Sequence, residues 1–409
     1  MAGPTTRAAP ARGPGSDSPL RDPTYRRLFA AQVLSLVGTG LTTVALSLLA
    51  YDLAGQNAGV VVGVALASKM VAYVGIAPLT AAYTQRLGRR QLLIGLDLAR
   101  LVIVLALPLV TAPWQVYVLI FVLSACAAAF TPAFQALIPE ILEDEARYTQ
   151  ALSLSRVAYE LENLASPAIA AILLGFVSYD ALFVGDGVTF ALSALLVASA
   201  ALPHARAGSP AGRTWARITR GTRRYLAVAE LRGLLALNLA VASGSAVVVV
   251  NTVVYVRDEL GRGASDVALA LGAAGGGSLA TALVLPALLR RAPERRVLLA
   301  GGALLPLGLL TVAVVPGWTA LLTAWFVLGV GLAVVQTPAG RLVQRAVRGD
   351  DGPELFAAQF ALSHACWLLT YPVAGVVGSL AGLDIAAALL SARSAGAVLT
   401  AAWLWRARR

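Results

Sequence analysis

Residues 101–139 read LVIVLALPLVTAPWQVYVLIFVLSACAAAFTPAFQALIP and contain no Asp, Glu, Lys or Arg. A helix needs roughly 20 apolar residues to cross a bilayer, so this stretch is long enough for two crossings. Pro113 and Trp114 supply the turn between them, because proline breaks a helix and tryptophan favours the membrane–water interface. The stretch therefore predicts helices that run back and forth through a membrane.

The composition extends this interpretation to the whole chain of 409 residues. Apolar residues make up 58% of the chain and charged residues only 13%, a balance that excludes a water-soluble domain of this size. We therefore predict an all-α polytopic membrane protein. Its twelve transmembrane helices are expected near 27–53, 59–83, 91–110, 114–137, 149–177, 181–202, 233–256, 267–289, 297–315, 319–340, 355–380 and 384–405.

The two halves of the chain echo one another at an offset of 204 to 206 residues, as Trp114 matches Trp318 and Pro167 matches Pro372. A shift of six helices keeps both halves in the same orientation, which predicts two parallel-repeat six-helix bundles around a midplane site. The expected domains are a disordered tail (1–26), an N-terminal bundle (27–202), a basic linker with an amphipathic helix (203–232), a C-terminal bundle (233–405) and a basic tail (406–409).

The distribution of the 32 basic residues predicts the orientation. With a cytoplasmic N-terminus, the outer loops contain only Arg257 and Arg262, so the positive-inside rule places both termini in the cytoplasm. Arginines scattered over many short loops argue against nucleic-acid binding as the reason for the net charge of +11. The preference for arginine over lysine, with abundant alanine, favours the plasma (inner) membrane of a bacterium.

The segment between the second and third helices resembles a signature of the major facilitator superfamily, the pattern G-x-x-x-D-R-x-G-R-R. It falls on residues 81–90, where Arg86, Gly88, Arg89 and Arg90 match and Ala81 and Gln85 replace the glycine and the aspartate. In that family the loop braces the cytoplasmic gate. The resemblance covers essentially the whole chain after residue 20 and implies the two-bundle transporter fold.

Two further motifs resemble patterns within this superfamily. Asp97 and Arg100 are similar to the D-x-x-R of an exporter branch that includes enterobactin and macrolide efflux proteins. Asp97 either supplies the negative charge that the loop lacks or forms a local structural pair. The stretch 162–171 corresponds to a glycine-rich motif of antiporters, of which Pro167 is retained and Ser166 stays small, implying antiport.

Ionisable side chains inside a bilayer usually face a cavity or a partner, which makes them candidates for proton or cation coupling. Arg156 and Glu160 are four residues apart and are expected to neutralise each other. Glu162 points elsewhere on the same helix and is our first candidate for a carrier, the alternative being a structural pair with Lys69. Lys69 and Glu160 are themselves further coupling candidates. His364 is a further titrating candidate.

Amide side chains among apolar neighbours suggest a broad cavity for amphipathic solutes, although polar contacts within the bundles would look the same. These candidates are Gln135, Asn238, Asn251, Gln336 and Gln359.

The predicted function is a proton-coupled exporter of hydrophobic or amphipathic small molecules by alternating access. We expect a monomer in the lipid bilayer with a small-molecule substrate and protons as co-substrate, with no enzymatic activity, no cofactor, no bound metal and no nucleic-acid partner. The alternative is a nickel or cobalt exporter with Glu160, Glu162 and His364 as ligands, and a remote one is a non-transporting membrane receptor.

Overall fold

The computed structural model describes residues 18–54, 58–83, 88–202, 214–314, 317–349 and 351–406, and these contain helices and no β-strand. A long helix lies at each predicted span. Ten of the helices are long and apolar enough, within the described residues, to cross a membrane. Gln85 and Arg86 of the predicted gating loop lie outside the described residues.

The first bundle follows η1 (Pro19–Arg21) and consists of α1 (Pro23–Ala54), α2 (Ala58–Tyr83), α3 (Arg89–Ala106), which η3 (Leu107–Leu109) extends, α4 (Pro113–Ile141), α5 (Glu145–Leu174) and α6 (Tyr179–Ser199). Local sequence signals mark the first residues of two of these helices, α4 and α5. Pro113 is the first residue of α4, where a missing N–H costs nothing. The Asp144 carboxylate accepts the Arg147 N–H at 2.8 Å and so caps α5.

The second part begins with α7 (Thr214–Ala227), which lies within the predicted linker. The bundle that follows contains α8 (Ala229–Ala246), a π-helical turn (Val247–Asn251), α9 (Thr252–Val254), a second π-helical turn (Tyr255–Glu259), α10 (Ala264–Arg291), α11 (Glu294–Val314), α12 (Trp318–Gln336), α13 (Ala339–Ala346), α14 (Gly352–Ala381) and α15 (Leu383–Arg406).

The sequence Thr-Pro-Ala occurs in both halves, at 131–133 and 337–339, and behaves differently in the two bundles. In the first bundle, α4 continues through Pro132. In the second, α12 ends at Gln336 and α13 starts at Ala339, so the helix predicted at 319–340 is divided at Pro338. A proline inside a helix removes one backbone hydrogen bond, and tertiary packing decides whether the helix bends or ends there.

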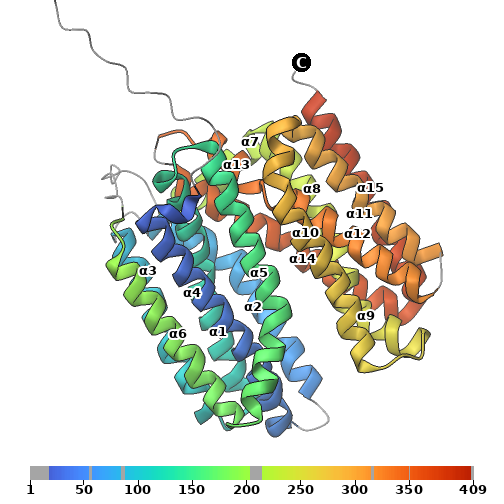
Figure 1. Cartoon of the computed structure of the whole chain (residues 1–409), viewed down its shortest axis with the longest axis horizontal. Helices are drawn as coiled ribbons and strands as arrows, with labels where there is room; N and C mark the ends of the chain where they lie inside the picture. The colour runs from blue at the N-terminus through green and yellow to red at the C-terminus, as the bar shows by residue number, and fades with distance from the viewer. Residues whose placement is uncertain are drawn as a thin grey trace, which may run out of the picture.

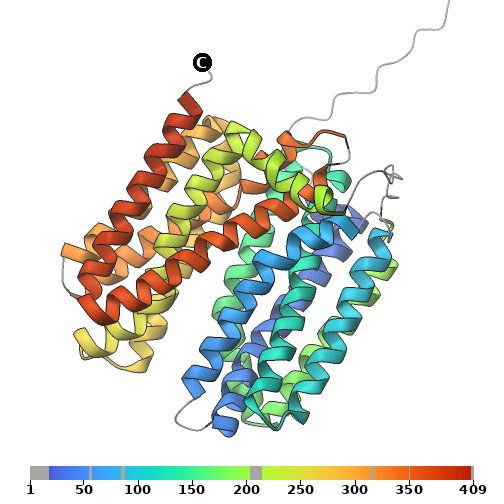
Figure 2. The same cartoon turned by 180° about the vertical axis from the view of Figure 1, so that it is seen from behind.

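The two bundles lie side by side in Figures 1 and 2, the first coloured blue to green and the second yellow to red. They approach one another at the end that holds α7 and α13, which we call the α7 end, and diverge toward the end that holds α9 (Figure 2). The most extensive contacts between them are those of α2 with α14 and of α5 with α10. Since α10 is the repeat of α2 and α14 the repeat of α5, the two pairs are related by the internal symmetry.

Close backbone contact stabilises the packing of α10 on α12 in the second bundle. A Cβ atom on Gly277 would collide with the carbonyl oxygen of Phe326, and one on Gly329 would collide with that of Ala274. Small residues at a helix interface let two backbones approach closely, which is the main source of packing energy in a membrane. The fully buried Trp325 anchors the same region by donating to Thr252 Oγ1 at 2.8 Å.

Candidate functional site

A cavity of about 1030 Å³ lies between the two bundles and forms the candidate substrate site. Most of its wall comes from α1, α2, α4 and α5, and the π-turn after α8 together with α14 supplies the side from the second bundle. Apolar and aromatic side chains are interspersed with a few hydroxyl, amide and charged groups, as is typical of sites for organic ligands. The apolar and aromatic part includes Leu36, Met70, Tyr73, Phe130, Phe134 and Tyr371.

Two of the predicted ionisable residues face this cavity from neighbouring helices. Lys69 of α2 and Glu162 of α5 both lie on its wall, and their charges interact. The Lys69 ammonium is 5.5 Å from the centre of the Tyr73 ring, which is within cation–π distance. The structure thus places an ammonium group and a carboxyl group on the wall of the same cavity.

The Arg156–Glu160 ion pair forms within α5, as the spacing predicts. Ser278 of α10 donates to Glu160 at 2.7 Å, and Arg156 donates to Ser278 at 2.7 Å and to Gln336 of α12 at 2.6 Å. Because α10 and α12 belong to the second bundle, this pair ties the two bundles together. The carboxylate of Glu160 is therefore committed to the interface, while Glu162 faces the cavity.

Asp97 and Arg100 pair with one another inside the first bundle, which is the structural alternative considered for their motif. Asp97 also accepts a hydrogen bond from Ser193 of α6 at 2.8 Å. The Arg100 guanidinium lies between the rings of Phe130 and Phe190, 4.3 and 4.5 Å from their centres, and reaches the cavity wall. Both charged groups are buried within α3, and a role of Asp97 toward the loop between α2 and α3 stays a prediction.

Of that loop the structure describes Gly88, which precedes α3, and the two arginines that follow it. Arg89 pairs with Glu140 near the end of α4, and Arg90 is exposed. The backbone of Ser166 and Pro167 lies within α5, but their side chains are outside the described part of the structure.

His364 belongs to an aromatic cluster at the contact of α2 with α14. Its ring is 4.8 Å from that of Tyr73 and 4.2 Å from that of Phe360, and its Nδ1 lies 2.7 Å from the Phe360 carbonyl oxygen. Among the described residues, no group of three or more His, Cys, Asp and Glu side chains is placed to hold a metal ion. The structure therefore does not bring His364, Glu160 and Glu162 together as ligands.

The predicted amide residues occupy different surroundings. Gln135 lines the cavity. Asn238 and Asn251 are buried within the second bundle, where Asn251 donates to the Ala374 carbonyl at 3.2 Å. Gln336 accepts from Arg156, and Gln359 accepts from the Tyr225 hydroxyl at 2.5 Å. In this conformation Asn251, Gln336 and Gln359 bond other helices, and a role in substrate binding stays a prediction for these three and for Asn238.

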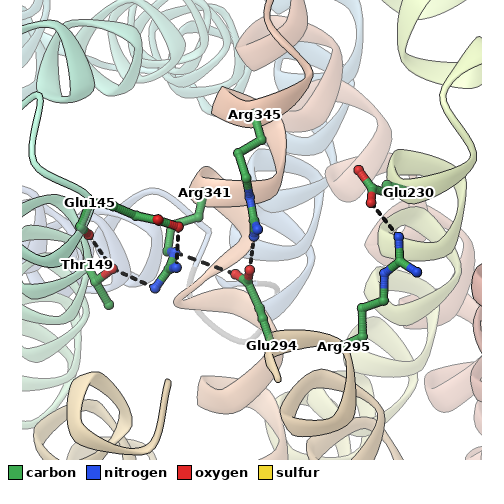
Figure 3. A network of polar contacts seen from close by, with 7 residues as sticks. All are labelled: Glu145, Thr149, Glu230, Glu294, Arg295, Arg341 and Arg345. Atoms are coloured by element: carbon green, nitrogen blue, oxygen red, sulfur yellow. Dashed lines mark hydrogen bonds and ion pairs between the residues drawn. The ribbon is translucent and has the colours of Figure 1, made fainter. Parts of the chain in front are cut away.

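A network of charged side chains joins the bundles at the α7 end (Figure 3). Arg341 of α13 pairs with Glu145 of α5 and donates to Thr149 at 2.7 Å. Arg341 also lies 3.6 Å from Glu294 of α11, which pairs with Arg345. The contacts with Glu145 and Thr149 cross between the bundles, whereas those with Glu294 stay within the second.

Sequence reasoning missed this network and also gave Asp186 of α6 no role in the site. Glu294 and Arg341 stand in segments that read as ordinary charged loops, and nothing in their spacing indicates a partner in the other bundle. Asp186 is fully buried, and its carboxyl accepts from Thr42 of α1 at 2.6 Å. The signal that was available is its position inside an otherwise uncharged helix.

Two similar helical bundles around a central cavity, with polar groups at its wall, define a membrane transporter. The profile described as transmembrane secretion effectors, a family of the major facilitator superfamily, matches residues 15–349. The chain belongs to this family.

Individual relatives are distant. The chain is 24% identical over 375 residues to YfiS, an uncharacterised major-facilitator-type transporter of Bacillus subtilis (strain 168), and the match covers 88% of each chain. Among solved structures, the human organic anion transporter MFSD10 (TETRAN) superposes with a TM-score of 0.80 at 14% identity, covering 94% of this chain and 100% of that one. The fucose:proton symporter of E. coli superposes with a TM-score of 0.73 at 14% identity, covering 93% of this chain and 98% of that one. These two likenesses show the fold.

Proposed function

We propose that this transporter exports hydrophobic or amphipathic organic compounds from a bacterial cell, in exchange for protons, within the exporter branch that its D-x-x-R motif resembles. The observation that carries the proposal is the joint position of Glu162 and Lys69 on the wall of a cavity of about 1030 Å³. Aromatic and aliphatic side chains around these two charges suit a solute with a large apolar body and a few polar groups.

Coupling follows from the charge balance at the wall. With Glu162 ionised, it compensates the positive charge of Lys69, and with Glu162 protonated, the cavity keeps a net positive charge. A proton and a positively charged group of the solute then compete for the Glu162 carboxylate, which is the basis of exchange. Glu160 does not serve in this way because Arg156 and Ser278 already hold it.

Alternating access requires that the bundles separate at one end while they close at the other. The network at Arg341 supports closure of the α7 end in the conformation described. We assign this end to the cytoplasm, because the sequence places nearly all loop arginines on this side. The cavity in this conformation then serves release to the outside and proton uptake from it.

The test is proton flux in energised everted vesicles, with ethidium, taurocholate, Ni²⁺ and Co²⁺ added separately. The proposal predicts that an organic probe collapses the proton gradient and that Glu162→Gln abolishes the response. Glu143→Gln, which removes an exposed carboxylate at the α7 end, is the matched control and is expected to behave like the wild type. A response to the metals alone, or one that survives Glu162→Gln, would overturn the assignment.

A further inference from the structure

A line of buried charged groups lies along the contact of α3 with α6, behind the cavity wall. From the α7 end, the order is Asp97, Arg100 and Asp186, because Asp97 bonds Ser193 of α6, Arg100 stacks on Phe190, and Asp186 is one turn beyond. Asp97 and Asp186 are 0% exposed and Arg100 is 5% exposed. Among the described side chains, this line contains two carboxyl groups and one guanidinium.

Asp97 holds a negative charge in this arrangement. It pairs with Arg100 and accepts from the Ser193 hydroxyl at 2.8 Å, so both of its oxygens meet a donor. A buried carboxylate is stable when it is paired and hydrogen-bonded in this way. The guanidinium of Arg100 is therefore already paired with Asp97.

The contacts of Asp186 point to a protonated carboxyl. Thr42 Oγ1 donates to its Oδ2 at 2.6 Å. Thr189 Oγ1 lies 2.8 Å from the Asp186 carbonyl oxygen and 3.2 Å from Oδ1. A hydroxyl has one hydrogen, and the shorter contact takes it, so two oxygens would face each other at Oδ1 without a proton. A proton on Oδ1, donated to Thr189, satisfies every contact.

The charges around Asp186 agree with this reading. Thr42 of α1 and Arg100 of α3 face Asp186, and Asp97 of α3 pairs with Arg100. Cys126 of α4 and Tyr73 of α2 lie near Arg100. None of these groups adds a second cation. An ionised Asp186 would leave one buried charge uncompensated, which is strongly unfavourable.

We propose that Asp186 is a proton-binding site of this transporter, distinct from Glu162 and linked to the cavity by Arg100. Arg100 lies on the cavity wall, and its Nε is a buried donor without a hydrogen-bond partner. If the guanidinium moves from Asp97 toward Asp186, Asp186 releases its proton and Asp97 binds one in its place. One arginine and two carboxyl groups thus move one proton between Asp186 and Asp97, about two helical turns apart along α6, and this does not depend on Glu162.

Infrared spectroscopy of the purified protein tests this directly, because a protonated carboxyl has a carbonyl stretch that a carboxylate lacks. At neutral pH we expect one such band to disappear in Asp186→Asn and to persist in Glu143→Gln, which removes an exposed carboxylate outside this line. Glu162→Gln is measured in parallel, so a failure of the carrier assignment to Glu162 is seen separately. An unchanged spectrum in Asp186→Asn would overturn the proposal.

Thr189→Val provides a variant that keeps Asp186 in place. Removal of the hydroxyl deletes the acceptor of the proposed proton, so the band is expected to shift in frequency without disappearing. If Asp186→Asn fails to fold, this shift carries the test, and a band that stays at its original frequency in Thr189→Val would contradict the proposal. Thr43→Val, which removes an exposed hydroxyl of α1, is the control and is expected to leave the band unshifted.

Discussion

Replacement of Arg341 by Gln is expected to open the α7 end. Only contacts that cross between the bundles affect the balance between conformations. The contact of Arg341 with Glu294 stays within the second bundle, so its energy is the same in both conformations. The bond to Thr149 contributes about 1.5 to 3 kcal/mol as a hydrogen bond to a charged group. The pair with Glu145 adds about 0 to 1 kcal/mol, because the Glu145 side chain is 61% exposed. The sum is about 1.5 to 4 kcal/mol, a roughly 10- to 1000-fold shift in the conformational ratio.

Distances between spin labels on cysteines at positions 90 and 296 measure this shift. Arg90 and Arg296 are both exposed, at the starts of α3 and α11 in the two bundles. With the native cysteines Cys126 and Cys366 replaced by alanine, Arg341→Gln is expected to increase the population of long distances at the α7 end.

The control is a second arginine with an ion pair of the same kind. Arg295 of α11 bonds Glu230 at 2.5 Å, but both residues belong to the second bundle (Figure 3). Arg295→Gln is therefore expected to leave the distance distribution unchanged. An unchanged distribution in Arg341→Gln, or an equal shift in both variants, would refute the idea that the contacts of Arg341 close this end.

The remaining predictions concern stability in detergent, measured as the midpoint of thermal unfolding. Gly277→Ala is expected to destabilise the protein by about 1 to 3 kcal/mol, because its Cβ would collide with the Phe326 carbonyl. Gly276→Ala, where the Cβ meets nothing within 4 Å, is expected to have little effect, and equal effects at both positions would refute the packing argument. The double variant Asp97→Asn/Asp186→Asn is expected to cost about 3 to 5 kcal/mol, because it leaves Arg100 buried without either counter-charge. A midpoint like that of the wild type would show that Arg100 does not depend on a buried carboxylate.

The candidate site was predictable from the sequence only in part. Lys69 and Glu162 were found because charged residues inside long apolar helices are rare and costly, and both lie on the cavity wall. The Arg156–Glu160 pair followed from helical spacing alone. Amide side chains are uncharged, so their positions in apolar helices did not show which of them line the cavity. Gln135 lies on the cavity wall, while Gln336 and Gln359 bond side chains that only the folded chain brings near them.

The sequence by itself determined that this is a helical membrane protein, where the spans lie, and that its two halves repeat, because hydrophobic length and periodicity are local properties of the chain. Only the tertiary structure decided which charged groups meet. Arg341 reaches Glu145 across the boundary between the bundles, and Asp186 lies beyond Arg100 along the contact of α3 with α6. Such pairings depend on how distant helices pack against one another, and local sequence spacing contains no information about that packing.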